Sequence, residues 1–310
     1  MTHDNVRRAV SRPFVLLVTD KDDSLTIANQ KIALDTVEVL DQFIAATQKQ
    51  EPMPPHVAVI SGMMVRDIHK QVTYRLPTSV RRRFHAMGSG GTEYSPPPHD
   101  PIIGPAYSKT WKDDFLKTDY VLLLKAIRDS LDELRDELQK LGIDGKAIAI
   151  QERKSKITIE VVADSTLNSR ADLLRQKIAE KIRKKQGVNS HLTTVTASSV
   201  AIDISLADKK QALHMLVDKL RIRKSGVSAK DMIRRTICFG DSRNDLPMLN
   251  EVAHNKGVSI WLGEPNPAIL HKKTLVLPLG LRGPKGFTYV MQHHLDWLER
   301  HKRGATNGKH

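Results

Sequence analysis

Short apolar runs alternate with stretches of helical spacing in the first part of the chain. Residues 14–18 (FVLLV) and 56–61 (HVAVIS) contain continuous apolar runs, which are typical of strands buried on both faces of a parallel sheet. Between them, residues 30–47 repeat apolar side chains at the spacing of one helix face. A strand, a helix and a second strand in this order predict a right-handed βαβ unit.

The same rhythm returns in the last third of the chain. The pattern there predicts strands over 236–240, 258–262 and 274–279 and helices over 209–221, 245–252 and 285–299. The final residues, HKRGATNGKH at 301–310, are polar and predict a frayed tail.

The middle of the chain has a different character. Glycine and proline are concentrated in residues 88–108, which predicts a loop and a domain junction. Beyond it the pattern predicts a small α+β domain, with helices over 116–141 and 170–186, each ended by a glycine, and strands over 147–151, 156–163 and around 192–205.

Together these elements predict an α/β fold in which a core is interrupted by an inserted domain. The core is expected to be a Rossmann-like, doubly wound and mostly parallel sheet, formed by residues 1–105 and 201–310. Residues 106–200 are expected to form the inserted α+β domain. The chain has 310 residues, of which 40% are hydrophobic, so a core of this size can be buried.

Composition excludes several classes of protein. No apolar run approaches the roughly 18–20 residues that a membrane span needs, and the run at 13–18 is short for a signal peptide. Cys238 is the single cysteine, which excludes an internal disulfide framework and a cysteine-based metal cluster. We therefore expect a cytoplasmic protein without a membrane partner.

The chain is basic, with 49 Lys and Arg against 35 Asp and Glu, which gives a formal charge of +14. Such a charge attracts polyanions. Only 5% of the residues are aromatic, and no basic stretch is interleaved with aromatic residues, so we do not expect a nucleic-acid partner. An ordinary solvated basic surface explains the charge, and a basic field around a site for phosphorylated small molecules is the functional alternative.

Acidic residues follow two of the predicted core strands. Asp20 and Asp22 come directly after the first strand, and Asp241 and Asp245 come after the strand over 236–240. Ligands bind beyond the carboxyl ends of strands in open α/β sheets, so the two clusters can converge there. Carboxylates crowded in this way favour a hard divalent cation, Mg²⁺ above all. Taken alone, each cluster is equally compatible with an exposed acidic loop.

Two further features fit an anionic substrate but are weak by themselves. Ser61 and Gly62 end the strand over 56–61, where a hydroxyl and backbone N–H groups can hold phosphate oxygens. Lys209, with Lys210 beside it, begins the helix over 209–221 and can offset the charge of carboxylates and phosphate. A polar turn and a surface lysine are the structural alternatives.

In chain order these motifs resemble those of the haloacid-dehalogenase-like hydrolases. VTDKDDSLT at 18–26 resembles the DxDxT loop of that superfamily, and GDSRNDLPML at 240–249 resembles its fourth motif. The position of the inserted domain resembles the C2-type cap of subfamily IIB. GSGGTEYS at 88–95, Trp111 and KSKITIEV at 154–161 are similar to sucrose-phosphate phosphatases, and GDSRNDLPML is also similar to mannosyl-3-phosphoglycerate phosphatases.

The resemblance implies roles for particular residues. Asp20 matches the nucleophile that forms an aspartyl-phosphate, and Asp22 matches the general acid. The Mg²⁺ ligands would be Asp20, the backbone carbonyl of Asp22 and Asp241, with Asp245 completing or orienting this set. The phosphate-binding residues would be Ser61, Gly62, Lys209 and Asn244.

Some positions depart from the family pattern. Lys21 stands between the two aspartates, where an apolar residue is usual, so its side chain must point away from the site or pair with a carboxylate. Lys209 and Lys210 stand where the family has Lys-Gly, which leaves the register of the third motif open by one residue; the QAL that follows favours Lys209.

The expected activity is that of a Mg²⁺-dependent phosphatase acting on a phosphorylated sugar or sugar derivative. Gln151, Lys154 and Lys156 of the inserted domain and Glu93 are the candidate substrate-binding residues, and exposed strand charges are the alternative for the first three. A phosphomutase and a phosphatase of a non-sugar phosphomonoester stay open as alternative functions. A non-catalytic relative that binds polyanions is a third alternative.

Overall fold

The computed structural model divides the chain into two units. The first comprises residues 1–108 and 209–310, and the second comprises residues 109–208. The boundaries predicted from the sequence were after residue 105 and after residue 200. The structure describes residues 3–48, 53–91, 93–97, 109–110, 148–153, 156–161, 194–197, 201–205, 208–222, 227–264 and 270–307, and single residues or short pieces between 125 and 184.

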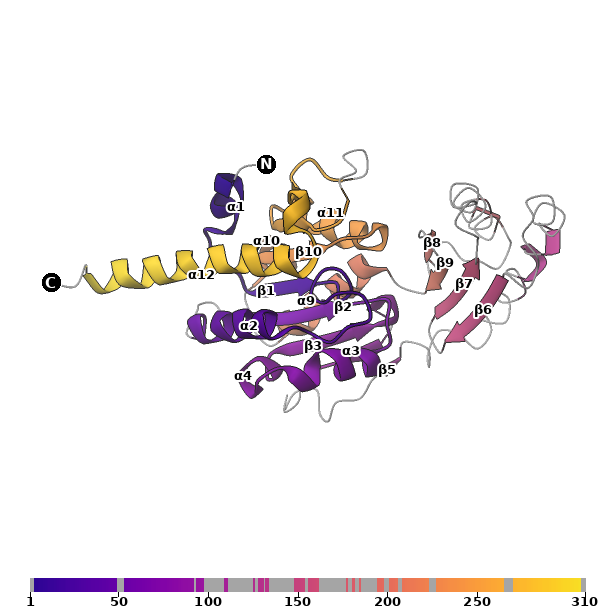
Figure 1. The fold of residues 1–310 in the computed structure, drawn as a ribbon, viewed down its shortest axis with the longest axis horizontal. Helices are drawn as coiled ribbons and strands as arrows, with labels where there is room; N and C mark the ends of the chain where they lie inside the picture. Colours follow the sequence, from indigo (N-terminus) through magenta and orange to yellow (C-terminus); the bar gives the residue numbers. More distant parts are fainter. Residues whose placement is uncertain are drawn as a thin grey trace. The chain divides into compact units, whose positions relative to one another are not determined.

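The first unit is built on a mostly parallel sheet (Figure 1). Its strand order is β12-β11-β10-β1-β2-β3-β4-β5, in which β12 to β3 run parallel and β4 runs antiparallel to β3. The strands are β1 (Leu16–Thr19), β2 (His56–Ile60), β3 (Phe84–Gly88), β4 (Glu93–Ser95), β5 (Lys109–Thr110), β10 (Thr236–Gly240), β11 (Val258–Trp261) and β12 (Leu275–Val276). The α/β fold expected from the sequence is confirmed.

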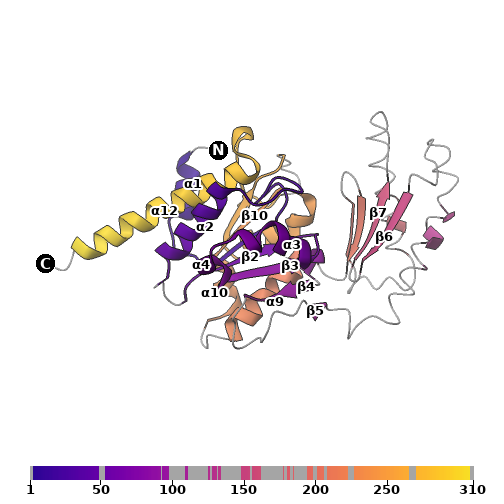
Figure 2. The same cartoon turned by 60° about the horizontal axis from the view of Figure 1, so that its bottom comes forward.

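Both faces of this sheet are covered by helices (Figure 2). Leu17 of β1 packs into one hydrophobic cluster, while Leu16 and Val18 pack into the other. Alternate side chains of a strand point to opposite faces of the sheet. Because both faces are covered, all four residues of β1 are buried. This two-sided burial explains why the strands appear in the sequence as continuous apolar runs.

The helices divide between the two faces according to the cluster that their buried side chains join. One cluster includes buried side chains from α1 (His3–Val10), α2 (Leu34–Ala46), α3 (Val65–Gln71), α4 (Thr78–Arg81) and α12 (Gly283–Asn307). The opposite cluster includes those of α9 (Lys209–Ile222), α10 (Ala229–Arg234) and α11 (Leu246–His254). The short 3-10 helices are η1 (Thr73–Arg75), η2 (Ser89–Gly91), η5 (Arg243–Asp245) and η6 (Leu279–Leu281).

Two parts of the sequence prediction for this unit were wrong. Residues 301–307 continue α12 as a helix instead of fraying, because a helix that is already nucleated extends readily through Lys, Arg and Ala. The Gly-rich start of the predicted loop contains β4, which pairs with β3 through Met87 and Tyr94. Positive φ angles at Ser89, Gly90 and Gly91 reverse the chain between these strands.

The second unit contains an antiparallel sheet with the strand order β6-β7-β9-β8. Its strands are β6 (Ile148–Arg153), β7 (Lys156–Val161), β8 (Thr194–Ala197) and β9 (Ala201–Ser205). β6 and β7 pair in antiparallel register from Ile148 opposite Val161 to Arg153 opposite Lys156. The helices expected over 116–141 and 170–186 fall largely outside the described residues.

Register and sequence together give this sheet a polar and an apolar set of positions. Gln151 pairs with Thr158 and Arg153 with Lys156, so these four positions share one face. The intervening positions, which belong to the other face, are mostly isoleucine or valine.

Among the described helices of the whole chain, none has the length and apolar character required to cross a membrane.

Leu17→Ala tests the two-sided burial of β1. Leu17 is fully buried, so removing its side chain should lower the free energy of unfolding by about 2–5 kcal/mol. Leu34→Ala is the matched control, because Leu34 is 78% exposed and the same substitution should change stability by less than about 0.5 kcal/mol. Urea unfolding followed by circular dichroism measures both, and equal losses would contradict the assignment.

Candidate functional site

The carboxyl ends of β1 and β10 bring the two predicted acidic clusters together. The strands are parallel neighbours, and Thr19 lies opposite Phe239. The Asp20 N–H donates to the Phe239 carbonyl over 3.1 Å. Asp20 therefore lies beside the segment that carries Asp241, although more than two hundred residues separate them in the chain.

Three carboxylates gather at this edge of the sheet. Asp20, Asp241 and Asp245 each offer an oxygen within 4.8 Å of the oxygens of the other two. Asp20 is 6% exposed and Asp245 is fully buried. Oxygen donors at this spacing suit a hard divalent cation, so these residues fit the ion that the sequence predicted.

Lys209 places a cation among the carboxylates. Its ammonium donates to Asp20 Oδ1 over 2.6 Å and to Asp245 Oδ1 over 2.5 Å. Lys210, the next residue, is about half-exposed and pairs with Glu251 on α11 over 2.8 Å. The structure therefore places Lys209 in the cluster and Lys210 outside it.

The second oxygen of Asp245 organises the loop after β10. Asp245 Oδ2 accepts from the N–H groups of Asp241 and Ser242 and from the Ser242 hydroxyl, each over 3.0 Å. Ser242 and Asp245 together form a capping box at the start of η5. Both oxygens of Asp245 are thus engaged, so this residue fixes the position of Asp241.

Two glycines allow the close approach that this loop requires. A Cβ at Gly240 would lie 2.5 Å from Asp245 Cβ, and a Cβ at Gly263 would lie 1.8 Å from the Asp241 carbonyl oxygen. Neither distance is compatible with a side chain, so the loop can pack in this way only with glycine at both positions.

Burial and mutual repulsion perturb the acidic groups. Burial, together with the Asp245 charge, raises the pKa of Asp20 to about 7, although Lys209 opposes this shift. Burial, Asp245 and Asp20 raise the pKa of Asp241 to about 8. Burial alone would lower the pKa of Lys209, but the carboxylates of Asp20 and Asp245 raise it above its usual value. A divalent cation at this place would relieve the repulsion among the carboxylates.

Asp22 lies in the turn that follows Asp20, but its carboxylate is not a member of the three-carboxylate group. Asp22 Oδ1 accepts from the Lys21 ammonium and from the Asn29 N–H, the latter over 2.9 Å. Lys21 is fully buried, so it pairs with a carboxylate, which is one of the two expected arrangements. In the same turn, the Ser24 hydroxyl donates to Asp241 Oδ1 over 2.9 Å.

Ser61 and Gly62 lie at the same edge of the sheet. Ser61 directly follows β2, which is the parallel neighbour of β1 on the side away from β10. Its side chain is buried, and its Oγ accepts from the Met63 N–H over 3.1 Å. Asn244 accepts from the Ser242 hydroxyl over 2.6 Å and thus belongs to the loop that carries Asp241.

Glu93 has a different environment from the one expected of a substrate contact. It is 6% exposed, and its Oε2 accepts from the Val65 N–H at the start of α3 over 2.8 Å. Its other oxygen accepts from the Ser89 hydroxyl over 3.2 Å. The carboxylate therefore caps α3 and holds η2, and both of its oxygens are engaged within the first unit.

The remaining predicted substrate residues belong to the second unit. Gln151 lies on β6 and Lys156 is the first residue of β7, both at positions of the polar face. Lys154 lies outside the described residues.

Sequence reasoning missed the roles of two serines. Ser242 and Asp245 have the spacing of a capping box, and this Ser-x-x-Asp signal was available in the sequence. The bond from Ser24 to Asp241 joins residues that are distant in the chain, and no local signal reveals it.

One protein-family model matches the sequence of this chain, and several solved structures share its fold. A family model described as haloacid dehalogenase-like hydrolase matches residues 115–278, which is more than half of the chain. The matched range contains Lys209, Asp241 and Asp245 and begins after Asp20. No curated protein matches the chain by sequence.

Several solved structures share the fold at low sequence identity. The C-terminal domain of trehalose-6-phosphate phosphatase from C. albicans has a TM-score of 0.63 at 13% identity, covering 96% of this chain and 97% of that one. Trehalose-6-phosphate phosphatase from Aspergillus fumigatus has a TM-score of 0.59 at 10% identity, with coverages of 94% and 97%. IMP-nucleotidase from Plasmodium falciparum has a TM-score of 0.58 at 12% identity, with coverages of 94% and 70%.

The raised pKa values predict how stability depends on pH without metal. Asp20 and Asp241 have pKa values near 4 when unfolded and about 7 and 8 when folded, so between these limits the folded chain binds more protons. The free energy of unfolding should therefore fall as pH rises from 5.5 to 8, by on the order of 5 kcal/mol. Urea unfolding in EDTA measures this.

A divalent cation such as Mg²⁺ would bind the ionised carboxylates, so adding it should reverse that loss, and by more at pH 8 than at pH 5.5. Asp241→Asn removes one of the titrating groups and should flatten the pH dependence. A metal-free protein that becomes more stable towards pH 8 would contradict the proposed crowding of these carboxylates.

Proposed function

Because the chain belongs to the haloacid dehalogenase-like hydrolases, we propose that it is a Mg²⁺-dependent phosphatase acting on a phosphorylated sugar or sugar derivative. The observation that carries this proposal is the convergence of Asp20, Asp241 and Asp245 with Lys209 at the carboxyl edge of the sheet. Phosphoryl transfer requires positioned groups and compensation of oxygen charge, and this cluster offers both.

The carboxylates of Asp20 and Asp241 and the backbone carbonyl of Asp22 are the proposed ligands of the cation. Asp245 would act through Asp241 as a positioning residue, because its oxygens are engaged by Lys209 and by the loop after β10. When bound, Mg²⁺ would offset negative charge on the phosphoryl oxygens and on the carboxylates around it.

Asp20 is the proposed nucleophile. A carboxylate oxygen of Asp20 attacks phosphorus, and the bond from phosphorus to the sugar oxygen breaks as the new bond forms. Lys209 donates to Asp20 Oδ1 and so favours its ionised form, which is the form that can attack. Ser61, on the neighbouring strand end, would hold a phosphate oxygen together with the backbone at Gly62.

Asp22 is the proposed general acid. It would give its proton to the departing sugar oxygen, and the aspartyl-phosphate on Asp20 would then be hydrolysed by a water molecule whose proton returns to Asp22. The contacts from Lys21 and the Asn29 N–H both fall on Oδ1, so Oδ2 is the oxygen expected to carry the proton. At the end, phosphate and the sugar are released, and both carboxyl groups are restored to their starting forms.

The sugar part of the proposal is supported by the shared fold with two trehalose-6-phosphate phosphatases and by the resemblance of GSGGTEYS to sucrose-phosphate phosphatases. Gln151, Lys154 and Lys156 are the proposed contacts beyond the phosphate. Glu93 is not among these contacts, because its carboxylate caps α3.

A substrate panel tests the proposal directly. Phosphate release should be measured from trehalose 6-phosphate, sucrose 6-phosphate, glucose 6-phosphate and IMP, with Mg²⁺ and with EDTA. We expect Mg²⁺-dependent release that is fastest for a sugar phosphate. Preference for IMP would replace the sugar by a nucleotide, and transfer to a second hydroxyl instead of water would indicate a mutase. Activity that persists in EDTA would contradict the metal site.

Asp20→Asn should lower kcat by about a thousandfold or more, because the amide is a poor nucleophile and a poor ligand for the cation. Asp23→Asn is the matched control. Asp23 is exposed and accepts from the Ala28 N–H over 3.1 Å, a bond that asparagine can also accept, so its kcat should stay within about twofold. Initial rates on the best substrate, with circular dichroism to confirm folding, decide between them.

Lys209→Gln should lower kcat/KM by about a hundredfold, because it removes the charge that faces Asp20 and the phosphate. Lys210→Gln removes the same charge one residue later, where the side chain pairs with Glu251, and should change kcat/KM by less than about threefold. A larger loss in Lys210→Gln than in Lys209→Gln would show that the third motif has been assigned to the wrong lysine, and equal losses would contradict a specific role for Lys209.

A further inference from the structure

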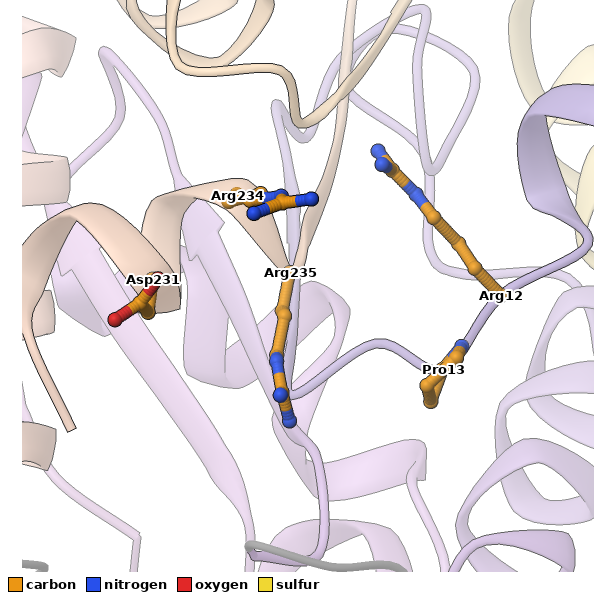
Figure 3. A pocket seen from close by; sticks show the side chains of 5 residues that line it. All are labelled: Arg12, Pro13, Asp231, Arg234 and Arg235. Atoms are coloured by element: carbon orange, nitrogen blue, oxygen red, sulfur yellow. The ribbon is translucent and has the colours of Figure 1, made fainter.

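Three arginines converge at the opposite edge of the same sheet, around a pocket of about 280 Å³. The pocket is lined by Arg12, Pro13, Asp231, Arg234 and Arg235 (Figure 3). Arg12 and Pro13 precede β1, and the last two arginines immediately precede β10. The two segments are joined by a bond from the Val15 N–H to the Arg235 carbonyl over 2.9 Å.

The pocket carries an excess of positive charge. Asp231, its one carboxylate, accepts from the Ser228 hydroxyl over 2.6 Å, and Figure 3 shows it pointing away from the space in which Arg12 and Arg234 face each other. Across the residue ranges described above, none of the three guanidinium groups forms an ion pair with a carboxylate. No described carboxylate therefore neutralises the charge of the three guanidinium groups.

Arg12 has a buried hydrogen-bond donor that an anion in the pocket could satisfy. Its Nε is buried and has no hydrogen-bond partner in the part of the chain that the structure describes, and its guanidinium lies 5.6 Å from the centre of the Phe14 ring. Burial and the nearby Arg234 lower its pKa. A single arginine in the last turn of α10 would suffice to complement the helix dipole, so that role does not explain why Arg12 approaches from a separate segment.

We propose that this pocket binds the phosphate group of a small phosphorylated molecule. Guanidinium groups recognise phosphate through paired N–H donors, and an anion between Arg12 and Arg234 would satisfy the buried Nε and relieve the repulsion between them. The volume is at the lower end for small-molecule sites, which suits a phosphate with a small organic group.

This site is separate from the carboxylate cluster. Arg12 and Arg235 lie at the amino ends of β1 and β10, whereas Asp20 and Asp241 lie at their carboxyl ends. The seven residue steps from Pro13 to Asp20, which include β1, span about 23 Å at roughly 3.3 Å per residue. The inference therefore goes beyond the proposed function and does not depend on it.

Calorimetric titration of inorganic phosphate into the full chain in EDTA tests the proposal without any catalysis. Arg12→Gln/Arg234→Gln should weaken the phosphate affinity about tenfold or more, since two charge-assisted contacts are lost. Arg234→Gln alone, at an exposed position, should give an intermediate loss in a protein that folds normally. Arg75→Gln, which removes the same charge at exposed Arg75 in η1, should leave the affinity within twofold.

Three results would overturn the proposal. The first is a phosphate affinity that is the same in wild type and in both pocket variants, which would place any binding elsewhere. The second is an equal loss in Arg75→Gln, which would show that net charge alone attracts phosphate. A short single-stranded oligonucleotide serves as a further probe, and if it bound far more tightly than phosphate with the same dependence on Arg12 and Arg234, the pocket would belong to a polyanion surface instead.

Discussion

The site at the carboxyl edge of the sheet depends on the two ion pairs that the buried ammonium of Lys209 forms with Asp20 and Asp245. Three carboxylates within 4.8 Å of one another repel strongly in a buried setting, and Lys209 compensates two of them directly. Removing one member of this cluster leaves a buried charge uncompensated, so the stability of each member depends on the others. Its four members come from the residue that follows β1, from the start of α9 and from the loop after β10, and the sheet brings these segments together.

The division of labour within the cluster follows from where the hydrogen bonds go. Asp245 is saturated by Lys209 and by the backbone of its own loop, which makes it a structural member. Asp20 and Asp241 have fewer hydrogen-bond partners and raised pKa values. Both properties are expected of carboxylates that could bind a cation. Glycine at 240 and at 263 permits this arrangement by allowing the backbone to approach.

Much of the first unit could be predicted from its sequence, because each buried strand of the sheet has a local signature. The runs that became β1, β2 and β10 are continuous and apolar, and the polar residues after them mark the edge where Asp20, Ser61 and Asp241 lie. Interactions that join distant residues have no such signature. Glu93 was expected at the substrate, but it caps α3, and the pairing of Lys21 with Asp22 depends on how the turn is buried.

The pairing of β1 with β10 has a consequence for how the chain reaches its native state. Leu16 and Thr236 lie opposite each other in neighbouring strands, but the whole second unit is synthesised between them. One side of β1 therefore has no partner strand until most of the polypeptide has left the ribosome, and closing so long a loop is entropically slow. The core has to assemble late, around an insertion that is already complete, and its unpaired strand edge is the part of the nascent chain most exposed to aggregation in the meantime.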